Sequence, residues 1–249
     1  MYDFIGKHEL FEWWDAGYID HTSRDLKSIQ DAWIYAQLVE ARGLRICEVG
    51  GGACRVLARL AERRRWMGRA RNECWNADRY EGDANGPAQA PKIRGVRHVK
   101  ANMGEFSREF PAGHFDVVFS ISVLEHVPID RLGDCFADMA RLLRPGGRML
   151  HAIDLYIDDE PRRSAQVDAY RSAALDPKLG LAWIVPPAIG EEVRFRCAYA
   201  SNSDHELASW NASGPSLRDR RAGAQSCSIV MALIKPENPQ PDESSARAV

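Results

Sequence analysis

Three consecutive glycines, Gly50, Gly51 and Gly52, stand directly after an apolar run that carries an acid, Glu48. Glycine accepts backbone angles that other residues resist, and its missing side chain leaves room for a ligand. The helical pattern that follows offers unpaired N–H groups and the positive end of a helix dipole. These residues predict a pocket for a nucleotide-like cofactor. Glu48 would suit a ligand that carries hydrogen-bond donors or positive charge.

A second group of reactive side chains follows two later apolar runs, and its members are Glu125, His126, His151 and Asp154. His126 is the natural general base, because the ordinary pKa of histidine lies near neutrality. Asp154 could act as a base or hold an acceptor. We therefore predict His126 and Asp154 as catalytic residues. The alternative is that Glu125-His126 at the start of a helix only caps and packs.

Arg55 argues against one class of cofactor. A dinucleotide-binding loop needs a third glycine three positions after Gly52, where the helix packs closely on the sheet. Arg55 occupies that position, so an NAD-dependent oxidoreductase is disfavoured. When the loop is considered alone, the glycine-rich turn has a second possible explanation, namely that it serves only packing.

The elements that must position these residues follow from hydrophobic periodicity. Apolar runs predict strands at 44–49, 74–78, 98–101, 114–121 and 148–155, and amphipathic patterns predict helices at 54–66 and 132–143. Pro145 blocks continuation of the second helix, and the glycines after it permit a reversing turn. The alternation predicts an α/β fold with a doubly wound, mostly parallel sheet and helices on both faces.

The two ends of the chain differ from this central part. Apolar and aromatic residues recur at helical spacing in residues 1–40, which predicts a helical N-terminal cap. Residues 193–199 and 227–234 are two further strand candidates. Residues 236–249 are rich in proline, serine and charge, which predicts a disordered tail.

Composition disfavours several classes of protein. The net charge is -2 and the pI is about 6.4, so the overall charge of the chain does not favour binding to nucleic acid. No apolar stretch reaches the roughly 18 residues that a membrane span needs. Six scattered cysteines without a C-x-x-C pair favour a reducing compartment, and the N-terminus lacks a secretion-signal pattern. We therefore predict a cytoplasmic protein. Seven arginines occur between Arg55 and Arg71, and we interpret this run as the solvated face of a helix and its exit.

Five segments occur in one order along the chain: Glu48-Val49-Gly50-Gly51-Gly52, Asp78, Phe115-Asp116-Val117-Val118-Phe119-Ser120, Leu124-Glu125-His126-Val127 and Leu143-Arg144-Pro145-Gly146-Gly147. Together they resemble the class I S-adenosylmethionine-dependent methyltransferases over roughly residues 44–155. The resemblance implies a Rossmann-like sheet of seven strands whose last strand is antiparallel. It implies a methyltransferase domain over residues 41–235, with an acceptor-side insert at 156–192.

The resemblance also implies which residues bind the cofactor. Gly50, Gly51 and Gly52 would pass close to the amino-acid part of S-adenosylmethionine, with Glu48 beside them. Cys54 stands where the family has its third glycine, and we expect this departure to shift the start of the helix slightly.

Asp78 is the expected ribose partner, because the two oxygens of a carboxylate match a diol. The gap from the first acid to Asp78 is longer than usual in the family, so Glu81 and Asp83 stay open as alternatives. The other expected contacts are Asn102 and Met103 at the adenine, and Ser120 and Ile121 below the methyl-bearing part.

A metal site is the next possibility that the resemblance raises. Some similar O-methyltransferases carry Glu-x-x-Glu-His in this segment and bind a divalent cation there. Ser122 replaces the first carboxylate here, and Glu125 and His126 alone are too few ligands for a dedicated site. We predict no required metal.

The activity that the resemblance implies is methyl transfer from S-adenosylmethionine, with S-adenosylhomocysteine as the product. We expect the acceptor to be a hydroxyl of a small-molecule or carbohydrate-like compound, with no nucleic-acid partner. The N-terminal segment and the insert, with Trp183 and the paired prolines Pro186-Pro187, would form its pocket. Nitrogen acceptors stay open, and so does a protein that binds the cofactor without catalysis.

Overall fold

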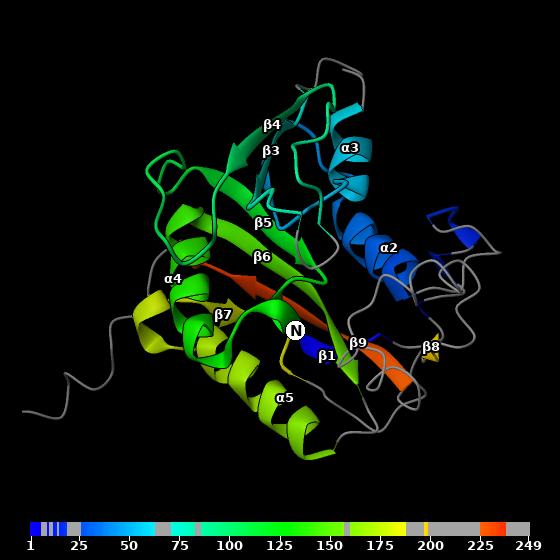
Figure 1. The fold of residues 1–249 in the computed structure, drawn as a ribbon, viewed down its shortest axis with the longest axis vertical. Helices are drawn as coiled ribbons and strands as arrows, with labels where there is room; N and C mark the ends of the chain where they lie inside the picture. Colours follow the sequence, from blue (N-terminus) through cyan, green and yellow to red (C-terminus); the bar gives the residue numbers. More distant parts are fainter. Residues whose placement is uncertain are drawn as a thin grey trace, which may run out of the picture.

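The computed structural model describes residues 1–5, 9, 12–13, 15–18, 26–62, 71–82, 86–156, 160–187, 197–198 and 225–237. Its centre is a sheet in the order β1-β9-β6-β5-β2-β3-β4 (Figure 1). The parallel strands are β2 (Arg45–Val49), β3 (Glu73–Asp78), β4 (Val96–Lys100), β5 (Phe115–Ile121) and β6 (Leu143–Tyr156). The predicted doubly wound, mostly parallel sheet is confirmed.

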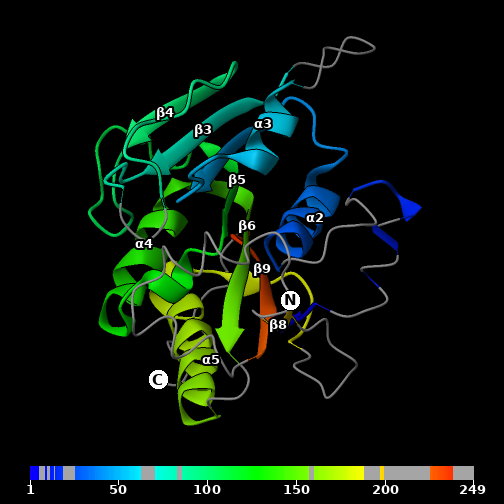
Figure 2. The ribbon, with the colours of Figure 1, turned by 45° about the vertical axis from the view of Figure 1, so that its right-hand side comes forward.

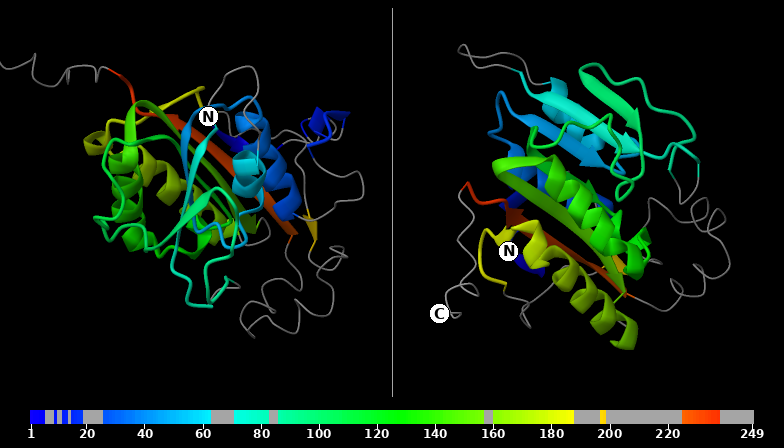
Figure 3. Two further views of the ribbon diagram at one scale, coloured as in Figure 1. Left: turned by 90° about the horizontal axis from the view of Figure 1, so that it is seen from above. Right: turned by 90° about the vertical axis from the view of Figure 1, so that its left-hand side faces the viewer.

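Helices cover both faces of this sheet (Figures 2 and 3). α2 (Leu26–Leu38) and α3 (Arg55–Glu62) lie on one face, and α4 (Leu132–Leu142) and α5 (Glu160–Ala174) lie on the other. Trp33 and Leu57 belong to the first apolar core, and Phe136 and Met139 belong to the second. The strands send alternate side chains into the two cores, which explains why they read as continuous apolar runs.

β9 (Gln225–Ile234) is the antiparallel strand of the sheet and pairs with β6 along nine residue positions, from Arg148↔Ile234 to Tyr156↔Ser226. Its other edge is shared by three short strands, namely β1 (Tyr2–Phe4), β7 (Ala182–Trp183) and β8 (Cys197–Ala198). β9 corresponds to the predicted strand at 227–234. Of the predicted strand at 193–199, only residues 197–198 lie within the described part of the chain.

The N-terminal residues add β1 to the sheet, so the prediction of helix is wrong for residues 2–4. Tyr2 is fully buried, and its hydroxyl donates to the carbonyl oxygen of Val167 in α5 at 2.6 Å. The Tyr2 ring also stacks on Trp183 with ring centroids 5.4 Å apart. The inward alternation of Tyr2 and Phe4 is the strand signal, and three residues are too few to show it from sequence.

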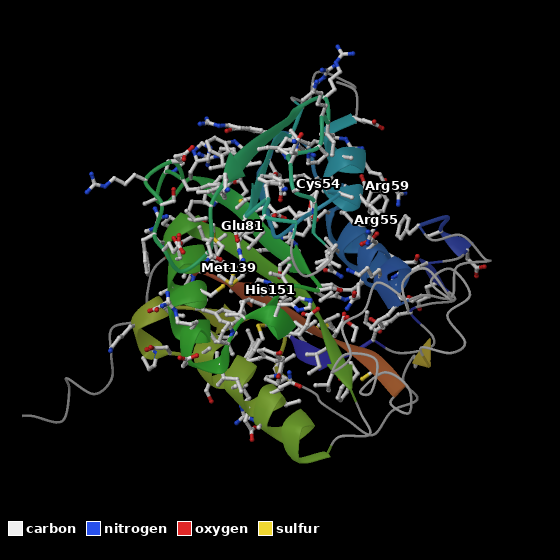
Figure 4. The ribbon with its side chains drawn as sticks, in the orientation of Figure 1. Cys54, Arg55, Arg59, Glu81, Met139 and His151 are labelled. Carbon is white, nitrogen blue, oxygen red and sulfur yellow. The ribbon has the colours of Figure 1, made fainter. Side chains whose placement is uncertain are left out.

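The arginines at the start of α3 are exposed, as the interpretation of a solvated helix face predicts, and they also contact α2. Arg55 forms a bidentate ion pair with Asp31 at 2.5 and 3.0 Å. The Arg59 guanidinium lies 3.7 Å from the ring centroid of Tyr35. Figure 4 shows both arginines on this side of α3. Residues 63–70, which hold most of the remaining run, lie outside the described residues.

The reversing turn after α4 is built into β6, which begins at Leu143 rather than near residue 148. The pairing with β5 shifts register between Phe115 and Val117, so the Pro145-Gly146-Gly147 turn forms a bulge. A Cβ at Gly147 would lie 2.9 Å from a backbone oxygen, so only glycine fits there. None of the helices described is both long enough and apolar enough to span a lipid bilayer.

Candidate cofactor and acceptor site

The glycine turn leads from β2 into α3 at the point where the sheet order reverses. β3 and β4 lie on one side of β2, whereas β5 and β6 lie on the other side. Open α/β sheets bind ligands at such switch points. The turn N–H groups of Gly50, Gly51 and Gly52 donate to the Ala77 carbonyl oxygen (2.7 Å), to Asn76 Oδ1 (3.1 Å) and to Asp78 Oδ2 (3.0 Å). The turn is therefore fixed against the end of β3.

Side chains cannot replace the first two glycines of the turn. A Cβ at Gly50 would lie 2.6 Å from Val123 Cγ2, and the residue has a φ of +65°. A Cβ at Gly51 would lie 2.6 Å from both Asn76 Oδ1 and the Glu48 carboxyl carbon. The backbone is therefore packed between Glu48 and the loop after β5.

Glu48 is buried beneath this turn, with 3% of its surface exposed. Its Oε2 has no hydrogen-bond partner among the described residues. Burial raises the pKa of Glu48 well above its usual value, and the negative charge of Asp31 adds to this shift. An unsatisfied buried carboxylate is costly, so Glu48 is suited to accept a hydrogen bond or positive charge from a ligand.

Cys54, which stands where the family has a glycine, adopts a left-handed backbone conformation. Its φ is 52°, in the left-handed region, and its side chain is fully buried. Its Sγ contacts the Gly52 carbonyl oxygen at 3.7 Å, and α3 begins at the next residue. The departure from the family pattern therefore leaves a left-handed residue directly before the helix.

Among the three candidate ribose acids, the structure brings Asp78 to the glycine turn. Its second oxygen, Oδ1, accepts the backbone N–H of Tyr80 at 2.9 Å. Glu81 is exposed and pairs instead with Arg79 at 2.6 Å. Asp83 lies outside the described residues.

A buried polar chain supports the same end of β3. The Asn76 amide donates to the Tyr80 hydroxyl at 2.8 Å, and that hydroxyl lies 2.8 Å from His98 Nδ1. Burial lowers the pKa of His98. These residues fix the side chain whose oxygen receives the Gly51 N–H.

The expected adenine contacts lie beyond β4. A hollow of about 340 Å³ is lined by Arg79, Glu81, Lys100, Ala101, Asn102 and Glu105. The exposed Asn102 donates to Glu105 Oε1 at 3.0 Å, and Met103 packs against the apolar core on the α4 side. Buried Asp138 of α4 accepts the N–H groups of Gly104 and Phe106, each at 3.0 Å, which anchors this loop.

Ser120 and Ile121 end β5, but they face opposite sides of the sheet. The fully buried Ser120 hydroxyl lies 2.7 Å from His151 Nδ1, and His151 contacts Phe136 of α4 edge to face. Burial lowers the pKa of His151 to about 3, so the ring is neutral near pH 7. Ile121 packs on the α2 side. The Ser120 side chain is therefore engaged inside the protein.

Asp154 lies at the α2 side of β6 within a polar cluster. Its Oδ1 accepts from Gln30 Nε2 at 2.7 Å and from the Ser122 hydroxyl at 2.8 Å. Gln30 Nε2 also donates to the Ser228 hydroxyl at 3.1 Å. α2, β6, β9 and the loop after β5 meet at this cluster, which places Asp154 at the edge where β5 ends.

Glu125 and His126 form a single helical turn after β5, and Glu125 interacts with both predicted catalytic residues. The Glu125 side chain is 9% exposed, whereas that of His126 is 54% exposed, and His126 Nε2 lies 3.8 Å from Glu125 Oε1. Burial raises the pKa of Glu125 well above its usual value, and the charge of Asp154 raises it further. No described contact joins His126 directly to Asp154.

A hollow of about 240 Å³ opens beside this turn. Its lining includes Glu125, His126 and Ile129 on one side, and Gln166 and Tyr170 of α5 on the other. α5 belongs to the predicted insert, which therefore contributes to this hollow. Trp183 instead stacks on Tyr2, and no described contact joins it to His126 or Asp154.

Gln30, Ser122, Asn76 and Tyr80 are site residues that the sequence interpretation missed. Gln30 did carry a signal, because it is a polar residue inside the apolar stripe of α2 and is fully buried. Ser122 has a φ of 53°, and the residues around it in the sequence do not predict this left-handed conformation. The contacts of Asn76 and Tyr80 depend on the register between strands.

Comparisons with known proteins agree with this geometry. Residues 47–151 match the sequence profile of a family described as a methyltransferase domain. A proposed sarcosine dimethylglycine methyltransferase from Galdieria sulphuraria has a TM-score of 0.54 and 16% identity, with 92% of this chain and 98% of that chain covered. A cyclopropane synthase from Mycobacterium tuberculosis has a TM-score of 0.52 and 14% identity, with 88% of each chain covered. No curated protein sequence matches the chain significantly.

A third similar structure contains the product of methyl transfer. It is a Haemonchus contortus phosphoethanolamine N-methyltransferase in complex with phosphomonomethylethanolamine and S-adenosylhomocysteine. Its TM-score is 0.51 at 14% identity, and the comparison covers 84% of this chain but only 52% of that one. At such identities the likeness concerns the fold, so the acceptor has to be inferred from the site.

The parallel sheet, with a glycine turn at its switch point and an acid at the end of the next strand, defines a Rossmann-like cofactor-binding domain. Together with the match of residues 47–151 to a methyltransferase domain, this fold supports a class I S-adenosylmethionine-dependent methyltransferase.

Proposed function

We propose that this chain transfers the methyl group of S-adenosylmethionine to a small-molecule acceptor that enters beside Glu125 and α5. The observation that carries the proposal is the turn at Gly50–Gly52, fixed against Asp78 on one side and closed by Val123 on the other. Val123 lies two residues before Glu125, so one loop joins the cofactor turn to the second hollow. Cofactor and acceptor would meet there.

The described residues fit the cofactor. Glu48 has an unsatisfied buried oxygen beside the turn, where the α-ammonium of the cofactor would satisfy it. Asp78 would exchange an N–H partner for the ribose hydroxyls, and the hollow at Asn102 would hold the adenine. Ser120 and Ile121 would contribute backbone rather than side chain below the methyl-bearing part, since the Ser120 hydroxyl is engaged with His151.

For the acceptor, the sequence favours a hydroxyl of a small or carbohydrate-like molecule. Such a hydroxyl must lose its proton during transfer, and the half-exposed ring of His126 could accept it and release it to solvent. Asp154 would act as a positioning residue, because Gln30 and Ser122 already hold its Oδ1. Nitrogen is the second candidate acceptor, favoured by the negative charge of Glu125 and Asp154.

Methyl transfer itself is tested with S-adenosylmethionine labelled in the methyl group, incubated with matched small alcohols and amines. We expect label in at least one acceptor, and about a hundredfold loss of rate in His126→Ala if this ring is the general base. A wild-type protein that binds the cofactor but labels no acceptor would favour a binding function without catalysis.

Chelation tests the prediction that no metal is required. Among the residues that the structure describes, no group of three or more His, Cys, Asp or Glu side chains could hold a metal ion. We expect the transfer rate to stay within twofold after treatment with EDTA. Loss of activity that magnesium, manganese or zinc restores would contradict this prediction.

A further inference from the structure

The acceptor-side hollow contains a buried carboxylate that lacks a side-chain hydrogen-bond donor among the described residues. Glu125 lines this hollow with only 9% of its side chain exposed. Neither of its oxygens has a hydrogen-bond partner among the described residues. Its ion-pair partner is His126, whose Nε2 lies 3.8 Å from Oε1 on a ring that is 54% exposed. A carboxylate placed in this way is stabilised by binding a cation or by taking up a proton.

The surroundings of Glu125 make a cation the better match. Asp154 adds negative charge from β6, and Lys27 of α2 opposes it from an exposed position. The residues that line the described hollow include no lysine or arginine. An anionic acceptor would therefore meet repulsion, and a neutral hydroxyl could not compensate a buried negative charge.

The opposite wall of the hollow is suited to the rest of a small molecule. Val127, Pro128 and Ile129 provide apolar surface next to the acid, and Gln166 and Tyr170 provide polar groups from α5. Ile129 is 59% exposed, so the apolar rim is open to solvent. A short organic cation could place its charged group at Glu125 and its carbon chain along this rim.

We propose that the methyl acceptor is a small primary or secondary amine whose ammonium group binds Glu125. This inference rests on the proposed methyl transfer and names the substrate class of the same site. Its difference from the hydroxyl acceptor is chemical, because only the amine brings a positive charge to the buried acid.

The transfer step balances without another reactant. The ionised Glu125 carboxylate takes a proton from the ammonium group and leaves a neutral amine. The nitrogen lone pair attacks the methyl carbon, the bond between carbon and sulfur breaks, and its electron pair returns to sulfur. The products are a methylated ammonium ion and S-adenosylhomocysteine, and the proton on Glu125 passes to solvent.

The test is calorimetric titration of the full chain saturated with S-adenosylhomocysteine. The probes are matched pairs that differ only in the acceptor group: ethanolamine and ethylene glycol, butylamine and 1-butanol, 2-phenylethylamine and 2-phenylethanol. We expect at least one amine to bind about tenfold or more tightly than its alcohol, and Glu125→Gln to remove that preference.

Asp130→Asn is the matched control, because it removes the same charge from an exposed residue near the rim. It should keep the preference for amines, and both variants should bind S-adenosylhomocysteine as the wild type does. If the wild type binds S-adenosylhomocysteine but no amine binds more tightly than its alcohol, the amine proposal is wrong. Preserved preference in Glu125→Gln also contradicts it. Failure to bind S-adenosylhomocysteine would instead contradict the proposed function.

Discussion

Two buried acids lie at the side of the sheet that carries the glycine turn and the acceptor-side hollow. Glu48 and Glu125 both have carboxylate oxygens with no hydrogen-bond partner among the described residues. One acid lies under the glycine turn and the other lines the acceptor-side hollow. A third buried acid, Asp138, is fully satisfied by backbone N–H groups and Arg141, and it supports a loop. The unsatisfied acids are therefore the ones expected to meet ligands.

Gly51 provides a steric test of the turn. Gly51→Ala would place its Cβ 2.6 Å from Asn76 Oδ1 and from the Glu48 carboxyl carbon. We expect a loss of about 1–3 kcal/mol in the free energy of unfolding, measured by urea denaturation, and weaker binding of S-adenosylhomocysteine.

Gly133→Ala is the control for this substitution, since Gly133 is helical and a Cβ there meets nothing within 4 Å. It should leave binding unchanged and stabilise the protein by roughly 0.5–1 kcal/mol. Equal effects of the two substitutions would show that the turn tolerates side chains.

His151 gives the protein a defined pH dependence of stability. Burial lowers its pKa to about 3 in the folded state, so below its ordinary pKa of 6.5 the unfolded chain binds a proton that the folded chain does not. The free energy of unfolding therefore decreases as pH falls from about 6.5 toward 3. The decrease that His151 causes is about 2 kcal/mol between pH 7 and pH 5.

Comparison with His151→Asn isolates this contribution, because all other titrating groups are shared. We expect the free energy of unfolding of the wild type to fall by about 2 kcal/mol more than that of the variant between pH 7 and pH 5. Parallel pH profiles of the two proteins would show that His151 titrates normally.

At the scale of elements, the loop after β5 is the part that joins the two hollows. Ser122 adopts a φ of 53°, Val123 covers Gly50, and Glu125 follows in a short 3-10 turn. The sequence identified the glycine turn and Asp78, because both stand at the ends of apolar runs. It did not place Ser120, because the direction of its side chain depends on strand register and on the buried His151 opposite.

β1 is one of the elements that sequence reasoning did not find, and its packing makes a clear prediction. Tyr2→Ala removes a fully buried ring that stacks on Trp183, so we expect a loss of about 3–5 kcal/mol in the free energy of unfolding. Tyr2→Phe keeps the ring but removes the hydroxyl hydrogen bond to the Val167 carbonyl oxygen, which should cost about 1 kcal/mol.

Urea denaturation measures both changes, with Ile129→Ala at an exposed position as the reference. That reference should stay within about 0.5 kcal/mol of the wild type. An equally small effect of Tyr2→Ala would mean that β1 does not contribute to the folded sheet.

At the scale of the whole molecule, a mostly parallel sheet with helices on both faces followed from the alternation of apolar runs, and the described structure agrees. The arrangement of strands at the β9 edge of the sheet could not be predicted from these runs, since three segments distant in sequence share one side of β9. The acceptor also could not be read from sequence, because the residues around its hollow come from the loop after β5 and from α5. Long-range packing decides both features.

The most direct test of the central claim is calorimetric titration of the protein with S-adenosylhomocysteine and, separately, with NAD. We expect a Kd of about 1–100 μM for S-adenosylhomocysteine and no binding of NAD. Asp78→Asn should weaken S-adenosylhomocysteine binding at least about tenfold, whereas Glu109→Gln, an exposed acid that lines neither of the two described hollows, should change it less than about twofold. Tight binding of NAD, or an unchanged affinity for S-adenosylhomocysteine in Asp78→Asn, would contradict the account.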